Sequence, residues 1–465
     1  MRVPLRVSLA ISAAALALFG LIRFVFNAVG VRAFGPEYVG DIGASVSGLT
    51  IVAVAIASVP SVLATKFVAE FRGANDVRRA ERIFSGAVVA TLLAGGVCTA
   101  ALAAAGRPAG HPALVAYVAL FGLYLVFKGT YFAFGIQKLY ARAEAIGAAA
   151  FGIVFAVACA GRRTDWATAS LLAQPACFAL VAAYDHRRFF GARSGLAELV
   201  RDWRGYGAYS AASFVNAMSG LGSYHLLVVV ASLRLDAAAL GYLNVMLAAL
   251  SPLSFIPTAY GAAAFPEMSL RHGEGDREGL RALIARSARA LQALAILSAG
   301  PLLVVPRAWL TLLHLPPRPD LVAAWCWLAV SIQIAMTSAP SGHHLNATRH
   351  IDRHALLSGF FLVTGVGVGS LALAAWGIAG AGIMRFAIDA PAAWGRMALS
   401  NRVVGWIGRD APRLLGGQVA MGTILAIALL MPRWPVTAAV WVVLAIPQLP
   451  ALGELARSVR SAPGS

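Results

Sequence analysis

Charged residues are scarce in this chain of 465 residues, because Asp, Glu, Lys and Arg together account for only 12% of it. A typical soluble domain is about a quarter charged and roughly half apolar. Here 59% of the residues are hydrophobic, so the composition excludes an ordinary soluble domain. Lysine is nearly absent and arginine supplies most of the positive charge. We attribute this preference to genomic base composition and infer nothing from it about a substrate.

Motifs for nucleotide, metal and nucleophile chemistry are also missing. The sequence contains no Walker motif, G-x-S-x-G, H-E-x-x-H or dinucleotide-binding fingerprint, which argues against an ATP-driven pump in one chain and against an enzyme. Its cysteines lie inside apolar segments without a C-x-x-C pair, as is typical of small buried side chains: Cys98, Cys159, Cys177 and Cys326. We therefore expect neither a cofactor nor a bound metal.

Long apolar runs are what the chain does contain, for example Val7–Phe34, Ile42–Thr65 and Leu114–Ile136. A bilayer core about 30 Å thick is crossed by roughly 20 apolar residues in a helix. The first run is longer than the apolar region of a signal peptide, so we interpret it as an uncleaved first membrane helix. The short alternating segments of a membrane barrel do not occur.

The sequence thus predicts an all-α integral membrane protein with about fourteen transmembrane helices. Breaks rich in charge, Gly or Pro separate the predicted spans. These spans are 6–33, 42–66, 83–105, 112–136, 143–161, 166–184, 207–232, 239–264, 289–309, 321–341, 354–374, 378–399, 414–431 and 435–455.

The basic residues assign a side of the membrane to each loop. With both termini in the cytoplasm, about 26 Lys and Arg fall on the cytoplasmic side and about 8 on the other. The most basic segments are 67–82, 185–206, 265–288 and 400–413. The net charge of +18 therefore indicates topology and attraction to anionic membrane lipids, and it does not indicate a nucleic-acid partner.

One charged stretch has a counterpart about two hundred residues later. PSVLATKFVAE at Pro60–Glu70 and PTAYGAAAFPE at Pro257–Glu267 each lead into G-x-x-D, at Gly73–Asp76 and Gly273–Asp276. Parallel six-helix repeats are a transporter architecture with the substrate path at the repeat interface. We therefore predict pseudo-symmetric lobes: an N-terminal lobe at 1–184, a cytoplasmic linker at 185–206, a C-terminal lobe at 207–400, and an additional helix pair and tail at 401–465.

Three segments also resemble a known family. FNAVGVRAFGPEYVGDIGA at 26–44, KFVAEFRGANDVRRAER at 66–82 and WGIAGAGI at 376–383 are similar to the bacterial polysaccharide and O-antigen unit flippases of the multidrug/oligosaccharidyl-lipid/polysaccharide exporter superfamily. The resemblance covers residues 1–400. It implies two six-helix lobes around a central cavity, and an inner-membrane flippase that moves polyprenyl-pyrophosphate-linked oligosaccharide by alternating access. We expect a monomer. Polysaccharide polymerase machinery is the implied partner.

Cations within the spans are candidates for binding the pyrophosphate, because a charge at mid-bilayer costs roughly 2.5–3.5 kcal/mol on insertion scales. They are Arg23 with Asn27 one turn on, Lys128 between Tyr124 and Tyr131, and Arg385. Arginine binds phosphate bidentately, and the tyrosines are candidates for packing against sugars. Two alternatives stay open: Lys128 reaches to the cytoplasmic face, or Arg385 and Asp389 neutralise each other.

Weaker candidates lie in other spans. Asn216 lies on a small polar stripe that is more typical of helix packing than of binding. Asp389 is the predicted ion-coupling carboxylate. His350 and His354 have a spacing that suits zinc, but a polar cytoplasmic loop with His343 and His344 is the plainer interpretation.

Two other functions remain as alternatives to the flippase. A multidrug or cation antiporter of the same superfamily would favour acidic residues in the cavity, whereas the charges within the spans here are mostly basic. A polysaccharide polymerase or ligase would need a large outer loop, and the longest, at Arg307–Pro319, contains no acid/base pair.

Overall fold

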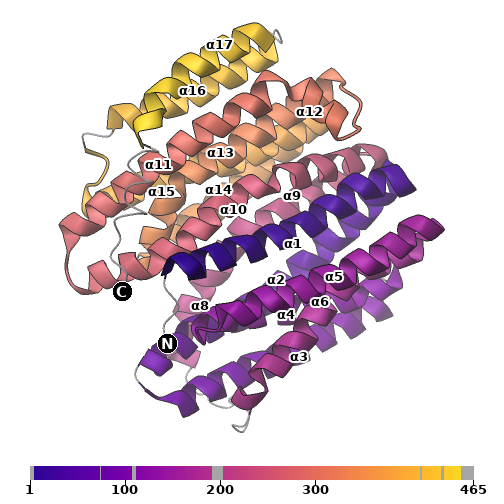
Figure 1. The fold of residues 1–465 in the computed structure, drawn as a ribbon, viewed down its shortest axis with the longest axis vertical. Coiled ribbons are helices and arrows are strands. Elements are labelled where there is room, and N and C mark those ends of the chain that lie inside the picture. Colours follow the sequence, from indigo (N-terminus) through magenta and orange to yellow (C-terminus); the bar gives the residue numbers. More distant parts are fainter. Residues whose placement is uncertain are drawn as a thin grey trace. The chain divides into compact units, whose positions relative to one another are not determined.

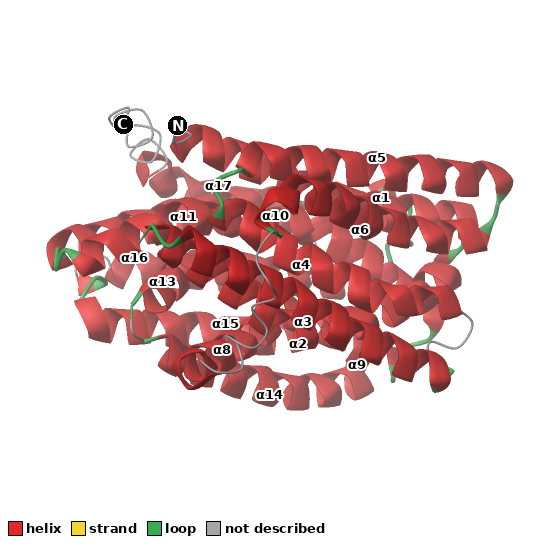
Figure 2. Ribbon diagram, turned by 90° about the horizontal axis from the view of Figure 1, so that it is seen from below, coloured by secondary structure: helices red, strands yellow, loops and turns green. Residues whose placement is uncertain are grey.

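The computed structural model describes residues 5–73, 75–106, 111–190, 203–348, 350–408, 411–430 and 434–451. Within these residues the chain forms helices joined by short turns, and none of them is in a strand (Figure 2). Eleven helices in the described part of the chain are long and apolar enough to cross a membrane. The predicted multi-pass, all-helical membrane architecture is therefore confirmed, and the number of about fourteen crossings stays a prediction.

The chain divides into two compact units, of which the first comprises residues 1–232 and 236–244. In Figure 1 its helices run from indigo to magenta. They are α1 (Leu5–Phe34), α2 (Pro36–Gly73), α3 (Val77–Ala104), η1 (Pro112–Ala116), α4 (Tyr117–Ala133), α5 (Gln137–Gly161), α6 (Thr164–His186), η2 (Arg187–Phe189), α8 (Trp203–Ala217), a π-helical turn η3 (Met218–Gly222), α9 (Ser223–Ser232) and the start of α10 (Ala237–Gly273).

The second unit comprises residues 233–235 and 245–465. It contains the rest of α10, α11 (Arg277–Val304), α12 (Pro306–Leu312), α13 (Pro319–Ala347), α14 (Ile351–Trp376), α15 (Ile378–Val404), α16 (Ala411–Leu430), α17 (Trp434–Ala445) and η5 (Ile446–Gln448). The boundary between the units lies inside α10, whereas the predicted lobes meet before α8. The lobe boundaries at 184 and 207 therefore stay a prediction.

The helix α13 lies at the centre of the second unit. It packs against α11 and α15, and α14 packs against α15. The C-terminal pair α16 and α17 packs against α11, where the Trp441 indole donates a 2.9 Å hydrogen bond to the Ile296 carbonyl. On α14, the side chains of Leu356, Val363 and Leu371 are about three-quarters exposed at 75%, 73% and 74%. Apolar side chains exposed to this degree are expected where a helix faces lipid.

The charged stretches 67–82 and 265–288 are not loops as the sequence predicts. Helix α2 continues to Gly73 and α3 begins at Val77, while α10 continues to Gly273 and α11 begins at Arg277. Charged residues outside the bilayer do not end a helix, so each helix extends beyond its apolar run.

The two short turns that remain share a residue of positive φ and an aspartate that caps the next helix. Asn75 and Gly275 both have positive φ, at 60° and 74°. Asp76 accepts a hydrogen bond from the Arg79 amide at 3.1 Å, and Asp276 accepts one from the Gly279 amide at 2.8 Å. Each aspartate therefore caps the helix that follows it. The G-x-x-D counterparts in the sequence thus correspond to one turn that occurs twice.

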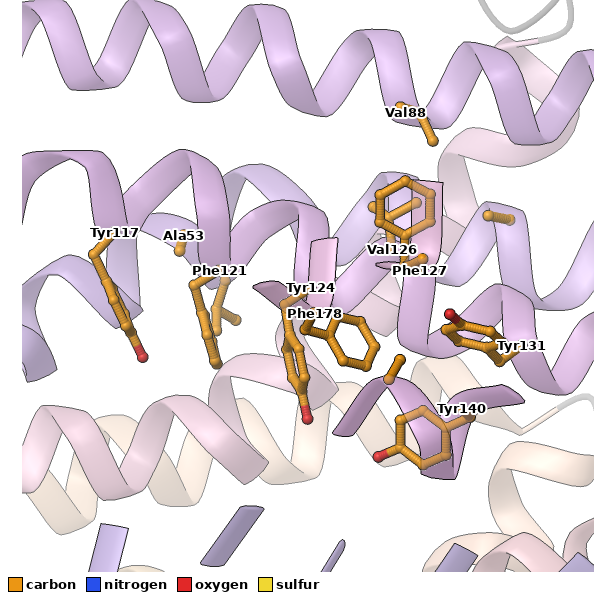
Figure 3. Packing of buried hydrophobic residues seen from close by; sticks show 14 of the residues in the cluster. Ala53, Val88, Tyr117, Phe121, Tyr124, Val126, Phe127, Tyr131, Tyr140 and Phe178 are labelled. Atoms are coloured by element: carbon orange, nitrogen blue, oxygen red, sulfur yellow. The ribbon is translucent and has the colours of Figure 1, made fainter. Parts of the chain in front are cut away.

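Aromatic residues of α4 form much of the core of the first unit. Tyr117, Phe121 and Tyr124 follow one face of the helix, and their rings stack with centroids 5.1 Å and 5.4 Å apart (Figure 3). Phe178 of α6 packs against Tyr124 at 4.6 Å. The core therefore holds α4 and α6 together by stacked and tilted rings, which stabilise beyond the area they bury.

Close packing also joins the start of α2 to the start of α10 within the first unit. A Cβ atom at Gly40 would lie 1.9 Å from the Ala237 carbonyl oxygen, and one at Gly241 would lie 2.0 Å from the Pro36 carbonyl oxygen. Asn244 lies so close to Gly43 that a Cβ there would meet its amide nitrogen at 2.0 Å. Glycine is thus required at Gly40 and Gly241 for the backbones to approach, whereas at Gly43 the neighbour is a side chain.

Candidate functional site

A cavity of about 70 Å³ lies among the helices of the first unit around Arg23 of α1. Its polar lining comes from α1, α2, α4, α6, α9 and the start of α10. The polar side chains are those of Arg23, Asn27, Ser47, Tyr117, Gln174, Tyr224, His225 and Asn244. Apolar side chains such as Phe19, Phe26 and Ile42 complete the lining. We call this the Arg23 pocket.

One of the two terminal nitrogens of the Arg23 guanidinium has a hydrogen-bond partner and the other has none within the described part of the chain. Its Nη1 lies 3.3 Å from Nε2 of His225, and its Cζ lies 5.2 Å from the centroid of Phe19. Since arginine only donates, His225 Nε2 accepts, and its protonated Nδ1 donates to the Ser47 hydroxyl at 3.1 Å. The Nη2 atom of Arg23 is buried and has no hydrogen-bond partner among the described residues.

Two further predicted residues lie near Arg23. The Asn27 amide donates a 2.7 Å hydrogen bond to the Arg23 carbonyl, which fixes it on the same face of α1. Lys128 of α4 lies near the same Phe19 ring, with its Nζ 6.0 Å from the ring centroid. The structure therefore brings Arg23, Asn27 and Lys128 to one region of the first unit.

A buried carboxylate, Glu144 of α5, lies next to this region. It accepts a 2.7 Å hydrogen bond from the Tyr124 hydroxyl and a 3.3 Å hydrogen bond from the Gln174 amide. Gln174 also lines the Arg23 pocket. Lys128 Nζ lies 5.6 Å from the Tyr124 ring centroid. The carboxylate is thus connected to the pocket through one amide side chain.

The two predicted tyrosines bind carboxylates rather than presenting their rings in this pocket. Tyr124 binds Glu144, and Tyr131 donates a 2.9 Å hydrogen bond to Asp185 at the end of α6. Arg142 of α5 forms an ion pair with the same Asp185. Both tyrosine side chains are buried in the aromatic core, so a sugar-binding role for them stays a prediction.

Arg385 and Asp389 lie together on α15 in the second unit. The Arg385 Nε donates to Asp389 at 2.6 Å, and the Ser331 hydroxyl of α13 donates to the same oxygen at 2.8 Å. This is the arrangement of the mutual-neutralisation alternative. The Asp389 carboxylate is therefore already provided with two donors.

Asn216 lies at the end of α8, just before the π-helical turn. Both polar atoms of its amide are buried without a hydrogen-bond partner among the described residues. Buried amides usually have partners, so this side chain is an exception within the first unit. A π-helical turn is often found at a functional position.

The histidines of α13 and α14 do not form a metal site in the described part of the chain. His344 Nδ1 lies 2.9 Å from the Ser400 hydroxyl, and His354 Nδ1 lies 2.9 Å from the Asn346 amide oxygen. No group of three His, Cys, Asp or Glu side chains able to hold a metal occurs among the described residues.

Sequence reasoning did not identify Glu144 or His225. The predicted span beginning at 143 placed Glu144 at a membrane boundary, whereas α5 begins at Gln137 and buries it. His225 lies within a predicted span, in the apolar stretch SYHLLVVV, and its position there was the available signal. A titratable side chain well inside an apolar run is a candidate for a functional site, just as a cation is.

Neither a protein-family model nor a curated protein sequence matches the chain. Solved structures do resemble it. An inward-facing multidrug resistance MATE family transporter of the MOP superfamily has a TM-score of 0.63 and 15% identity, and the match covers 89% of this chain and 98% of that one. An outward-facing structure of such a transporter has a TM-score of 0.62 and 16% identity, with 86% and 97% covered.

A third similar structure is a MOP superfamily transporter from Pyrococcus furiosus. It has a TM-score of 0.59 and 13% identity, and the match covers 92% of this chain and 97% of that one. Its reported feature is a binding pocket of reverse polarity, which suggests a different function for that protein. Together these likenesses show that the chain has the fold of MATE transporters of the MOP superfamily. They do not single out the polysaccharide flippases within it.

Proposed function

We propose that the chain is a membrane transporter that works by alternating access and carries its substrate through the Arg23 pocket. The fold supports this proposal, because transporters with the same fold have been solved in inward-facing and outward-facing conformations. The pocket of about 70 Å³ is smaller than the roughly 300–1,000 Å³ of typical ligand sites. A substrate therefore requires a wider conformation, which alternating access supplies.

Export of drug-like small molecules is the substrate class that the solved structures favour, since two of them are named as multidrug resistance transporters. The observation that carries the finer proposal is the buried, unpartnered Nη2 of Arg23. A cationic substrate would be repelled by this guanidinium, whereas an anionic group would complete its hydrogen bonds. We therefore assign amphiphilic anions to this pocket.

The experiment compares two dyes of similar size, one with a carboxylate and one with a quaternary ammonium, in proteoliposomes. The protein should move the anionic dye faster, and Arg23→Gln should lower that rate at least tenfold. The matched control is Arg32→Gln, which removes the same charge from an exposed position on the same helix. Preferred transport of the cation, or equal rates in both variants, would contradict the assignment.

Flipping of lipid-linked oligosaccharide is the second candidate, and the same side chain favours it. A pyrophosphate is an anion that arginine binds bidentately, and both Arg23 and Lys128 lie near the Phe19 ring. An inner-membrane location and polysaccharide polymerase partners belong to this candidate. Proteoliposomes with fluorescent polyprenyl-pyrophosphate-linked sugar test it: movement of this lipid with no movement of the anionic dye would favour the flippase.

A coupling ion would act at a carboxylate, and two are candidates. Asp389 is the residue predicted from sequence, but it forms an ion pair with the cation Arg385, whereas the donors to Glu144 are neutral. Glu144 is the better placed of the two, because Gln174 connects it to the Arg23 pocket. We therefore propose Glu144 for ion coupling in the first unit.

A further inference from the structure

A second and larger cavity, of about 500 Å³, lies in the second unit where four helices end. The lining comes from the end of α10, the start of α11, the start of α14 and the end of α15. Its basic side chains are Arg271, His272, Arg277, His350, Arg353 and Arg402. The volume is within the roughly 300–1,000 Å³ that ligand sites typically have. We call it the arginine cavity.

The charge of this lining is strongly one-sided. Among the described residues that line it, Asp276 is the only carboxylate and four are arginines. That carboxylate caps α11 and lies 3.4 Å from Arg271. Arg277, Arg353 and Arg402 form no ion pair with any described residue, so three arginines of the lining are not held by a carboxylate.

Local backbone geometry adds to the attraction for an anion. The helix α14, which has 26 residues, begins at Ile351, and the preceding residue, His350, makes no side-chain capping bond. The first amide N–H groups of a helix carry partial positive charge and bind anions when nothing caps them. His350 and Arg353 bring this end of α14 to the cavity wall.

The orientation of the chain in the membrane does not by itself explain why these basic side chains line one cavity. The positive-inside rule accounts for arginines on the cytoplasmic side, but it is satisfied equally well by side chains dispersed over the surface. Here side chains from four separate helices line one concave volume. Mutual repulsion of these cations opposes such a grouping unless an anion binds between them.

We propose that the arginine cavity is a cytoplasmic binding site for a phosphate group, separate from the transport pocket. Several guanidinium groups that reach one volume from different helices suit the multiple oxygens of a phosphate. Two sources carry this chemistry: a soluble phosphate compound, and the head group of an anionic phospholipid at the cytoplasmic leaflet. A bound phosphate would join the ends of α10, α11, α14 and α15 and so stabilise the second unit.

The test uses the full-length purified protein and measures its melting temperature. One arm adds inorganic pyrophosphate to protein in neutral detergent. The other arm compares nanodiscs of phosphatidylglycerol and phosphatidylcholine with the same acyl chains, and native mass spectrometry counts retained lipid. We expect one arm to raise the melting temperature by a few degrees.

Two double variants give the test its specificity. Arg353→Gln with Arg402→Gln removes two cations from the cavity and should abolish the rise. Arg78→Gln with Arg286→Gln removes two exposed arginines outside the cavity and should keep it. Monodispersity in size-exclusion chromatography establishes that each variant is folded. If the cavity double variant is not folded, Arg353→Gln alone should reduce the rise.

The outcomes separate cleanly. A rise only with pyrophosphate assigns a soluble phosphate compound, and a rise only with phosphatidylglycerol assigns a lipid head group. No rise in the unsubstituted protein overturns the proposal. An equal rise in all variants also overturns it, because general surface charge would then explain the effect.

Discussion

Arg23 and Arg385 are both arginines inside apolar helices, and the structure gives them different surroundings. Arg385 contacts Asp389, its neighbour one turn along α15, so its charge is compensated within the helix. Arg23 contacts the imidazole of His225, which carries no compensating negative charge. A cation within an apolar helix that has no carboxylate partner needs another reason for its position, and a bound anion supplies one. Residue type alone does not distinguish these two cases, whereas the partner does.

The pair on α15 predicts a specific pattern of stability. Asp389→Ala leaves Arg385 without its carboxylate, and we expect a loss of about 3–5 kcal/mol in the free energy of unfolding. The double variant Arg385→Met with Asp389→Leu should recover most of this loss. Thermal unfolding in detergent measures both effects. Unchanged stability of Asp389→Ala together with lost ion dependence of transport would instead assign coupling to Asp389.

If Glu144 couples transport to an ion, removing its charge should remove the ion dependence of transport. Glu144→Gln keeps an acceptor for the Tyr124 hydroxyl and removes the charge, so the variant should fold and lose its response to an imposed pH or sodium gradient. The control is Glu278→Gln, at an exposed position. Transport in proteoliposomes with and without each gradient is the measurement. An unaltered gradient response in Glu144→Gln would place coupling elsewhere.

At the scale of helices, the closest approach in the first unit is between the starts of α2 and α10. Gly241→Ala puts a methyl group 2.0 Å from the Pro36 carbonyl oxygen, so the backbone of α2 or α10 must shift. We expect a loss of about 1–3 kcal/mol from this overpacking and a lower melting temperature. Gly48→Ala in α2 is the matched control, since nothing lies within 4 Å of its added methyl group. That control should gain up to about 1 kcal/mol from helix propensity. A melting temperature in Gly241→Ala as high as in the control would contradict the close approach.

The helix caps make a smaller prediction. Asp76→Ala removes the acceptor for the Arg79 amide and should lower the free energy of unfolding by about 0.5–2 kcal/mol. Asp76→Asn keeps an acceptor and should be nearly neutral. Equal destabilisation by both substitutions would show that charge, and not capping, is what matters at this turn.

The positions of the helices were more predictable from the sequence than the residues at which they end or the side chains that they bring into contact. Apolar runs locate the helices because the bilayer requires them, and the G-x-x-D counterparts identified one turn that occurs twice. The helix ends at Gly73 and Gly273 were missed because charge signals the membrane boundary rather than the end of a helix. The partner of Arg23 was missed because His225 lies 202 residues away in the chain.

For the whole molecule, the distribution of arginine predicts which helix ends face the cytoplasm. In a variant without native cysteines, Val77→Cys and Arg277→Cys should react with a membrane-impermeant thiol reagent only from the cytoplasmic side. Ala105→Cys and Arg318→Cys should react only from the other side. All four positions are exposed, so access through the protein does not limit labelling. Labelling of Val77→Cys and Ala105→Cys from one side would overturn the topology.

The repeated capped turn has a consequence for how such a chain is made. The predicted number of membrane crossings between Asp76 and Asp276 is even, so the predicted topology puts both turns on the same side of the membrane. On this topology the basic residues around each turn favour the same orientation of the helices that follow. A gene encoding one half can be duplicated and fused in tandem, and both copies then insert in the same orientation. In an inverted-topology repeat the second copy must insert in the opposite orientation. In the duplicated copy, the same kinds of basic residues that orient the first turn would then orient the second.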